Sequence, residues 1–247
     1  MSKLLLGVVL SLSVLTTGCA IKVQQPVALE PTFWEKQDST VGVIATEVPT
    51  PDTYLPGAGC LLCYAAASAA NSSLTKHFKT LPNDSVKNLK NEVVKLLESR
   101  GVKTSLLTES LKLEKLPRLS NKAVNAADRD FSTFAKSNVD YLLVLDINQL
   151  GAVRTYSSYI PTSDPQAVLS GRAFLVDLKS NTYVWYSPIN AQQAASGEWD
   201  EPPTFPGMTE AYYEVVDRGM NQVLQPLQMQ QTATTNTTNT STTSAPQ

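Results

Sequence analysis

The sequence contains few charged residues, and both of its ends are without charge over long stretches. Only 17% of the 247 residues are charged, against about a quarter in an ordinary soluble protein. No charged side chain occurs between residues 4 and 21, and none follows Arg218. The 20 basic and 22 acidic side chains give a formal charge of −2. That balance excludes the basic surface on which nucleic-acid binding depends, so we expect no nucleic-acid partner.

Histidine is almost absent, which restricts the chemistry that the chain could perform. His77 is the only one, so any Ser-His-Asp triad would have to use it. Its neighbours from residue 72 to 76 are mostly polar, and we expect His77 on the solvated side of a helix. No phosphate-binding loop, dinucleotide fingerprint or zinc-protease motif occurs. The sequence therefore predicts a protein that is not an enzyme, with no metal site and no cofactor.

The longest apolar run is too short to span a membrane. It covers residues 4–15 (LLLGVVLSLSVL), follows Lys3 and ends before Thr-Thr-Gly-Cys. A membrane-spanning helix needs about 20 apolar residues. The segment 1–18 is therefore predicted to be a secretory signal peptide.

The end of this segment carries a possible modification site, Cys19. The run Leu-Thr-Thr-Gly-Cys resembles the lipobox of bacterial lipoproteins, although Thr16 stands where leucine is commonest. The resemblance implies diacylglycerol on the Cys19 thiol, acyl chains such as palmitate, and the membrane as a partner. Ala20 resembles the default for sorting to the outer membrane, with the domain facing the periplasm. The alternatives are a signal peptide with an incidental cysteine and an uncleaved anchor.

Composition divides the rest of the chain into three parts. Residues 19–37 contain two prolines without sustained periodicity, and we expect a lipidated tether. Residues 38–229 contain periodic apolar segments and predict a single periplasmic domain. Residues 230–247 are rich in threonine and uncharged, which predicts a disordered tail.

The domain shows short apolar runs alternating with helical patterns. The predicted strands are 41–45, 102–107, 141–147, 167–178 and 182–191. The predicted helices are 60–81, 84–100, 126–137 and 209–228. The order β-α-α-β-α-β-β-β-α predicts an α/β fold, a three-layer mixed sheet with flanking helices.

Three of these segments carry a family resemblance. The strand 41–45, the run NVDYLLV at 138–144 and the hairpin LVDLKSNTYVW at 175–185 resemble the bacterial lipoprotein superfamily that includes CsgG, LpoB and the amino-terminal domain of TolB. The resemblance implies a periplasmic accessory or assembly factor that binds other envelope proteins without catalysis. It also leaves open a homo-oligomer, or a secretion-channel subunit as in CsgG. The segment 151–171 is short and holds two prolines, which argues against pore formation.

Two cysteines three residues apart, Cys60 and Cys63, are the side chains of the domain with the most evident potential for reactivity. They follow Gly-Ala-Gly at a predicted helix start, where the helix dipole favours a thiolate. An oxidising compartment favours a disulfide between them. Unpaired core cysteines, a redox-active pair and a zinc site remain alternatives.

A group of aromatic and arginine side chains suggests a contact surface, because such residues anchor protein interfaces. The candidates lie in or near the loops 151–166 and 196–207 and are Arg154, Tyr156, Tyr159, Trp199 and Phe205. The alternative is that most of them pack on the domain's own sheet.

Three carboxylates surround Trp199 in a proline-rich loop, Glu198, Asp200 and Glu201. A carboxylate pair could serve a glycosidase, and an acidic loop is the simpler interpretation. An envelope enzyme, acting through these carboxylates or through the two cysteines, is therefore the alternative to an accessory protein.

Overall fold

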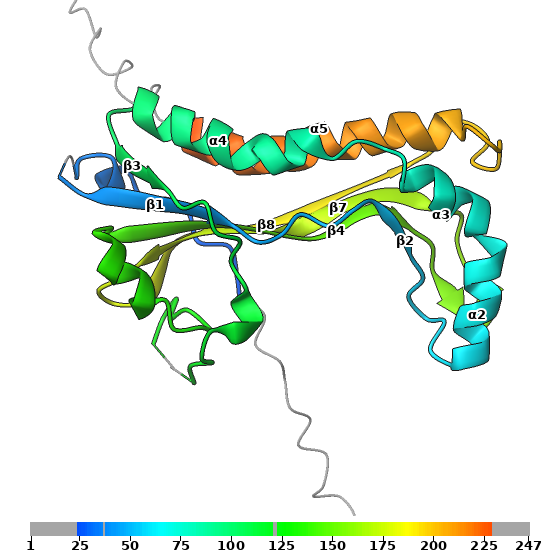
Figure 1. Cartoon of the computed structure of the whole chain (residues 1–247), viewed down its shortest axis with the longest axis horizontal. Helices are drawn as coiled ribbons and strands as arrows, with labels where there is room; N and C mark the ends of the chain where they lie inside the picture. The colour runs from blue at the N-terminus through cyan, green and yellow to red at the C-terminus, as the bar shows by residue number, and fades with distance from the viewer. Residues whose placement is uncertain (1–23, 37, 121–122, 229–247) are drawn as a thin grey trace, which may run out of the picture.

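A mixed sheet of six strands runs the length of the molecule (Figure 1). The computed structural model describes residues 24–36, 38–120 and 123–228. The strands are β1 (Thr40–Ala45), β2 (Asp52–Tyr54), β3 (Lys103–Leu106), β4 (Tyr141–Val153), β7 (Gln166–Asp177) and β8 (Thr182–Ala194). Their order is β3-β1-β4-β7-β8, with β2 paired to β4. The β1, β2 and β3 pairings are parallel, and β4, β7 and β8 form an antiparallel meander. The predicted mixed α/β sheet is confirmed.

Strand β4 is longer than its sequence indicated, and β2 was not expected at all. The apolar run ends at Ile147, but β4 continues to Val153 and pairs there with β2. Gly151 makes this pairing feasible, since a Cβ there would collide with the backbone of Asp52. The strand β2 is three residues long and lies in a proline-rich loop, so its own sequence carries little strand signal.

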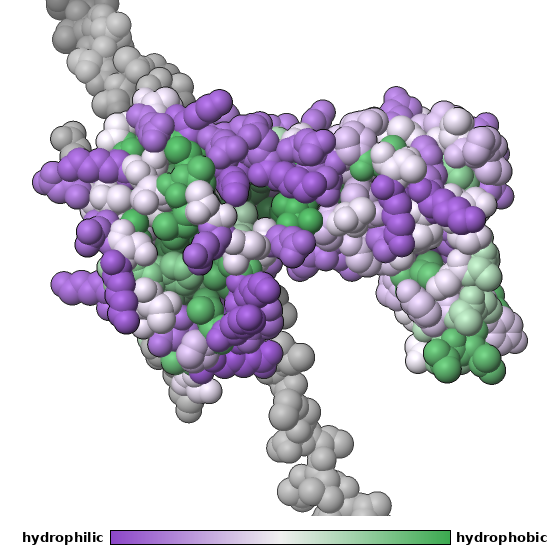
Figure 2. All heavy atoms as spheres, in the orientation of Figure 1, coloured by the Kyte–Doolittle hydropathy of each residue, from purple (hydrophilic) through white to green (hydrophobic). Residues whose placement is uncertain are grey.

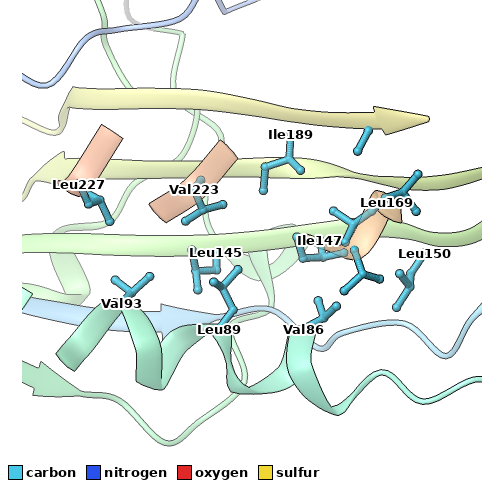
Figure 3. Packing of buried hydrophobic residues seen from close by; sticks show 14 of the residues in the cluster. Val86, Leu89, Val93, Leu145, Ile147, Leu150, Leu169, Ile189, Val223 and Leu227 are labelled. Atoms are coloured by element: carbon cyan, nitrogen blue, oxygen red, sulfur yellow. The ribbon is translucent and has the colours of Figure 1, made fainter. Parts of the chain in front are cut away.

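Helices α4 (Asp84–Ser99) and α5 (Pro206–Gln228) cover one face of the sheet (Figure 1). Figure 3 shows Val86, Leu89 and Val93 of α4 turned toward the strands. Together with Leu97 they form the buried face of α4, whereas Leu96 is only half-buried. Burial of each such side chain stabilises the fold by about 1.5–3 kcal/mol. The largest core therefore lies between the sheet and these two helices.

Irregular segments cover the opposite face of the sheet. They include the 3₁₀ turns η2 (Leu113–Lys115) and η3 (Ser132–Ser137), and they enclose a second core around Phe131 and Phe174. The predicted helix at 126–137 does not form, and only η3 is helical. The backbone there is held extended along β8, because the Ala127 amide donates to the Asn181 carbonyl and the Tyr183 amide to that of Asn125.

The described part of the expected tether packs against the domain. Val27 exchanges two backbone hydrogen bonds with Tyr186 at the edge of β8. Phe33, in η1 (Pro31–Phe33), is buried with its ring edge-on to that of Tyr141. The folded unit thus begins before residue 38. The signal peptide, Cys19 and the tail at 230–247 lie outside the described residues.

An arm projects from one end of the sheet, away from the layer of α4 and α5 (Figure 1). It comprises residues 55–60, α2 (Leu61–Ala70) and the hairpin of β5 (Tyr156–Ser157) and β6 (Ile160–Pro161). The sequence predicts one helix over 60–81, but the chain breaks at Asn71 before α3 (Ser72–Phe78). No helix within the described ranges combines the length and the apolar character needed to cross a bilayer.

Candidate interaction surface

The base of the arm is built around Tyr156, which is only 6% exposed. Its ring packs with Ala58, Cys63 and Ala67 in a small core. Its backbone amide donates to the Pro56 carbonyl. Its hydroxyl accepts a hydrogen bond of 2.7 Å from the Asn71 amide, which also donates to the Ala67 carbonyl. These contacts tie the hairpin to the start and the end of α2.

Arg154 joins this base to the loop that precedes α5. Its guanidinium donates to the Ser163 carbonyl at 3.0 Å and to the Asn71 side chain at 3.3 Å. It also lies 4.6 Å from the ring centroid of Trp199, a cation–π contact. The structure thus brings together Arg154 and Trp199, which are distant in sequence. It uses them to brace the arm.

Cys60 and Cys63 are joined by a disulfide at the start of α2. Cys60 is exposed and Cys63 is buried. The Cys60 sulfur accepts the backbone amide of Cys63 and so caps the first turn of α2. Within the described ranges no three His, Cys, Asp or Glu residues gather as a metal site would require.

Large apolar side chains are exposed at two places on the arm. The first turn of α2 presents Leu61 and Leu62, 85% and 81% exposed, with Tyr64 at 55%. The hairpin presents Tyr159 and Ile160, 66% and 55% exposed. Figure 2 shows the arm ending in a hydrophobic patch. Exposed apolar surface of this kind marks interaction sites in soluble domains.

One feature of the sequence, a long stretch without charge, could have indicated this exposed surface. No charged residue occurs from 53 to 75, between Asp52 and Lys76. A helix without a polar face is normally buried, yet within α2 only Cys63 and Ala67 are buried. The uncharged stretch therefore coincides with a helix whose apolar side chains are largely exposed.

Two residues predicted at the interface are buried instead. Tyr156 belongs to the core of the arm, and Phe205 is 2% exposed in the main core. Residue type alone does not distinguish an aromatic anchor from a core aromatic. Tyr159 is exposed, and so is Ile160, which the sequence did not single out.

His77 lies between two helices rather than on a solvated face. Its Nε2 atom is 2.7 Å from the Thr209 hydroxyl, and its ring centroid is 5.5 Å from that of Phe205. Burial lowers the pKa of His77. The side chain thereby links α3 to the beginning of α5.

The three carboxylates near Trp199 do not converge into an enclosed site. Glu198, Asp200 and Glu201 are all exposed, while Trp199 is half-buried against Arg154. This is the arrangement of an acidic surface loop.

A second candidate site is a cavity of about 260 Å³ beside the first described residues. Its lining includes Gln24, Asp128, Arg172 and Tyr183. Arg172 lies 2.9 Å from Asp146 and 3.8 Å from Asp128. Burial alone would lower the pKa of Arg172. The hydrogen bond to Asp146 and the negative charge of that side chain outweigh this effect, so the pKa of Arg172 is raised. Burial, with the neighbouring Asp128, raises the pKa of Tyr183. These groups satisfy one another and fasten residues 123–128 to the sheet.

Comparisons with known proteins show distant structural likeness only. No protein-family model and no curated protein sequence matches this chain. A dodecameric PelC variant from Paraburkholderia phytofirmans is 11% identical, with a TM-score of 0.34 over 83% of this chain and 94% of that one. Lipoprotein GNA1162 from Neisseria meningitidis is 10% identical, with a TM-score of 0.32 over 73% and 99%. Protein XCC0632 from Xanthomonas campestris is 14% identical, with a TM-score of 0.31 over 81% and 91%. The chain is similar to these structures, and likeness at this level assigns neither a family nor a function.

Proposed function

We propose that this chain is a lipid-anchored, non-enzymatic accessory protein of the bacterial outer membrane that faces the periplasm. It binds other envelope proteins through the hairpin surface, which we define as Tyr159 and Ile160. The observation that carries this proposal is their exposure, 66% and 55%, on a hairpin whose base is fixed. The lipobox at Cys19 supplies the anchor and the location.

The fixed base explains why so small a surface can serve as a contact. Tyr156 and Arg154 hold the two ends of the hairpin through Pro56, Asn71 and Ser163. A hairpin whose backbone is already held in place loses less conformational entropy on binding than a free loop does. Tyrosine is also among the residues that contribute most to protein interfaces. Tyr159 is thus presented in the manner of an interface anchor.

The placement of the reactive side chains supports an interaction role over catalysis. His77 is engaged with Thr209 between helices. The carboxylates Glu198, Asp200 and Glu201 are spread on an exposed loop. Each of these groups has a structural or surface explanation.

Thiol–disulfide exchange is a second candidate function, and one observation favours it. Cys60 is exposed at the first turn of α2, where the helix dipole stabilises a thiolate. A strongly oxidising reduction potential, with turnover of a dithiol substrate that is lost on Cys60→Ser, would support exchange. A pair that resists reduction by glutathione would leave the disulfide a purely structural role.

Capture of partners from intact cells tests the proposed contact. Tyr159→Ala should reduce the recovery of crosslinked envelope proteins by about tenfold, as expected for a strong interface anchor. Tyr213→Ala is the matched control, because Tyr213 is 47% exposed on α5 and lies outside the arm. Trp199→Ala should weaken capture less, since Trp199 braces Arg154. If Tyr159→Ala and Trp199→Ala both recover the same partners as the parent protein, the hairpin surface is not the contact.

A further inference from the structure

The bulky apolar side chains of α2 are confined to its first turn. We define Leu61, Leu62 and Tyr64 as the α2 tip; they are 85%, 81% and 55% exposed. Behind them the exposed positions of α2 carry only alanine, at residues 65, 66, 69 and 70. The large apolar surface is therefore about one helical turn deep, or roughly 5 Å.

The α2 tip is free of charge as well as apolar. The nearest charged residues in sequence are Asp52 and Lys76, beyond the two ends of the stretch 53–75. Asp52 is paired at 3.3 Å with Lys79. Transfer of the α2 tip out of water thus removes no ionised side chain from its hydration, which is the costly part of such a transfer.

The arm points to the side of the molecule on which the described chain begins. It projects away from α4 and α5 (Figure 1). Gln24 lies on the same side of the sheet, opposite those helices, beside Arg172 and Tyr183. Four residues lie between Cys19 and Gln24, and the five Cα–Cα steps span at most about 18 Å. A lipid on Cys19 therefore keeps the bilayer close to the face toward which α2 projects.

We propose that the α2 tip inserts into the surface of the leaflet that holds the lipid on Cys19. This inference rests on the lipid anchor of the proposed function. Insertion gives the domain a second point of contact and so fixes its orientation on the membrane. The hairpin surface is then held at a set height above the lipid.

The size and the chemistry of the α2 tip favour lipid over a protein partner. Interfacial segments enter the headgroup and acyl boundary by about 5–10 Å, which matches one helical turn. Tyrosine, here Tyr64, is enriched at that boundary, where its ring is apolar and its hydroxyl remains hydrated.

Fluorescence from a tryptophan at the α2 tip tests this insertion. The full lipidated chain carrying Leu62→Trp is reconstituted into equimolar phosphatidylethanolamine and phosphatidylglycerol vesicles, with plain or brominated acyl chains. Brominated lipid should lower the added fluorescence at least about twofold, because interfacial residues reach the acyl boundary. Tyr213→Trp is the matched control, since Tyr213 is 47% exposed on α5, which covers the opposite face of the sheet from Gln24. Its fluorescence should not change, and adding Leu61→Asp to Leu62→Trp should abolish the quenching.

Flotation of the same vesicles separates the two proposals. Protein that floats with the lipid but shows no quenching at position 62 overturns the insertion and leaves the anchor intact. Protein that does not float refutes the lipid anchor, and the insertion with it. A photoreactive diazirine side chain at position 62 in intact cells should yield lipid adducts. Adducts to a second copy of the chain, or to another protein, would overturn the assignment to lipid.

Discussion

The side-chain amide of Asn71 lies 2.7 Å from the hydroxyl oxygen of Tyr156, and this contact closes the base of the arm. Asn71 is 2% exposed and stands at the break between α2 and α3. Its amide satisfies the Ala67 carbonyl as well, and its own oxygen accepts from Arg154. One side chain thereby ends a helix, fixes a hairpin and orients a guanidinium. The position of the arm depends on it.

Asn71→Ala should destabilise the protein by about 1–3 kcal/mol, because it removes the side-chain donor to the buried Tyr156 hydroxyl and one of the two hydrogen bonds to the Ala67 carbonyl. Chemical denaturation measures the change. Asn91→Ala is the control, since the Asn91 side chain donates to that of Asn88 in an exposed hydrogen bond on α4, and it should cost less than about 0.5 kcal/mol. Equal stability of the two variants would contradict the role of Asn71.

Gly151→Ala should destabilise the protein by about 2 kcal/mol or more, because the new Cβ collides with the backbone of Asp52 and the φ angle is positive. Loss of β2 pairing should follow, with faster amide exchange at Thr53 and Tyr54. Gly59→Ala serves as the control, since no atom lies within 4 Å of its Cβ. If the two variants unfold at the same denaturant concentration, Gly151 is not required for the pairing of β2 with β4.

Arg172→Leu should cost about 1–3 kcal/mol, because it removes the charged donor of the mostly buried Asp146 and leaves that carboxylate the Thr46 hydroxyl. Lys103→Ala removes an ion pair with Asp38 in which both side chains are well exposed. Exposed pairs contribute little, so this control should change stability by less than about 1 kcal/mol. Denaturant unfolding curves at neutral pH measure the stability of both variants. A larger loss of stability from Lys103→Ala than from Arg172→Leu would refute the structural role of Arg172.

His77 should make stability fall in mild acid. Burial lowers its folded-state pKa below the unfolded value of 6.5, so the unfolded chain binds the proton more readily. Its contribution is therefore complete above the unfolded pKa and declines as the pH falls from there toward the folded pKa. His77→Gln retains a hydrogen-bonding partner for Thr209 and should flatten this part of the profile. If the free energy of unfolding changes equally with pH in both proteins between pH 7.5 and 5.5, His77 is not the source of the pH dependence.

The main sheet and its two long helices could be predicted because their signals are local. The run at 141–147 is apolar apart from Asp146, since β4 is buried on both faces over that stretch. The spacing of Val86, Leu89, Val93 and Leu97 marks the buried face of α4. Each of these patterns depends only on neighbouring residues, so the sequence alone carries it.

The arm could not be predicted because distant partners shape it. The break at Asn71 is stabilised by Tyr156, and the β2 pairing depends on Gly151, in both cases far along the chain. The burial of Tyr156 and Phe205 likewise depends on what the fold places around them. The uncharged stretch 53–75 was readable, but its alanines are equally typical of an ordinary helix. Its significance follows only from the exposure of α2.

Site-specific photocrosslinking in intact cells tests the central claim, that Tyr159 presents a protein contact, most directly. A photoreactive residue at position 159 should give a discrete crosslinked band containing another envelope protein. The same residue at position 213, on the exposed side of α5, should give none. Bands of equal intensity from both positions, or no band from position 159, would contradict the account.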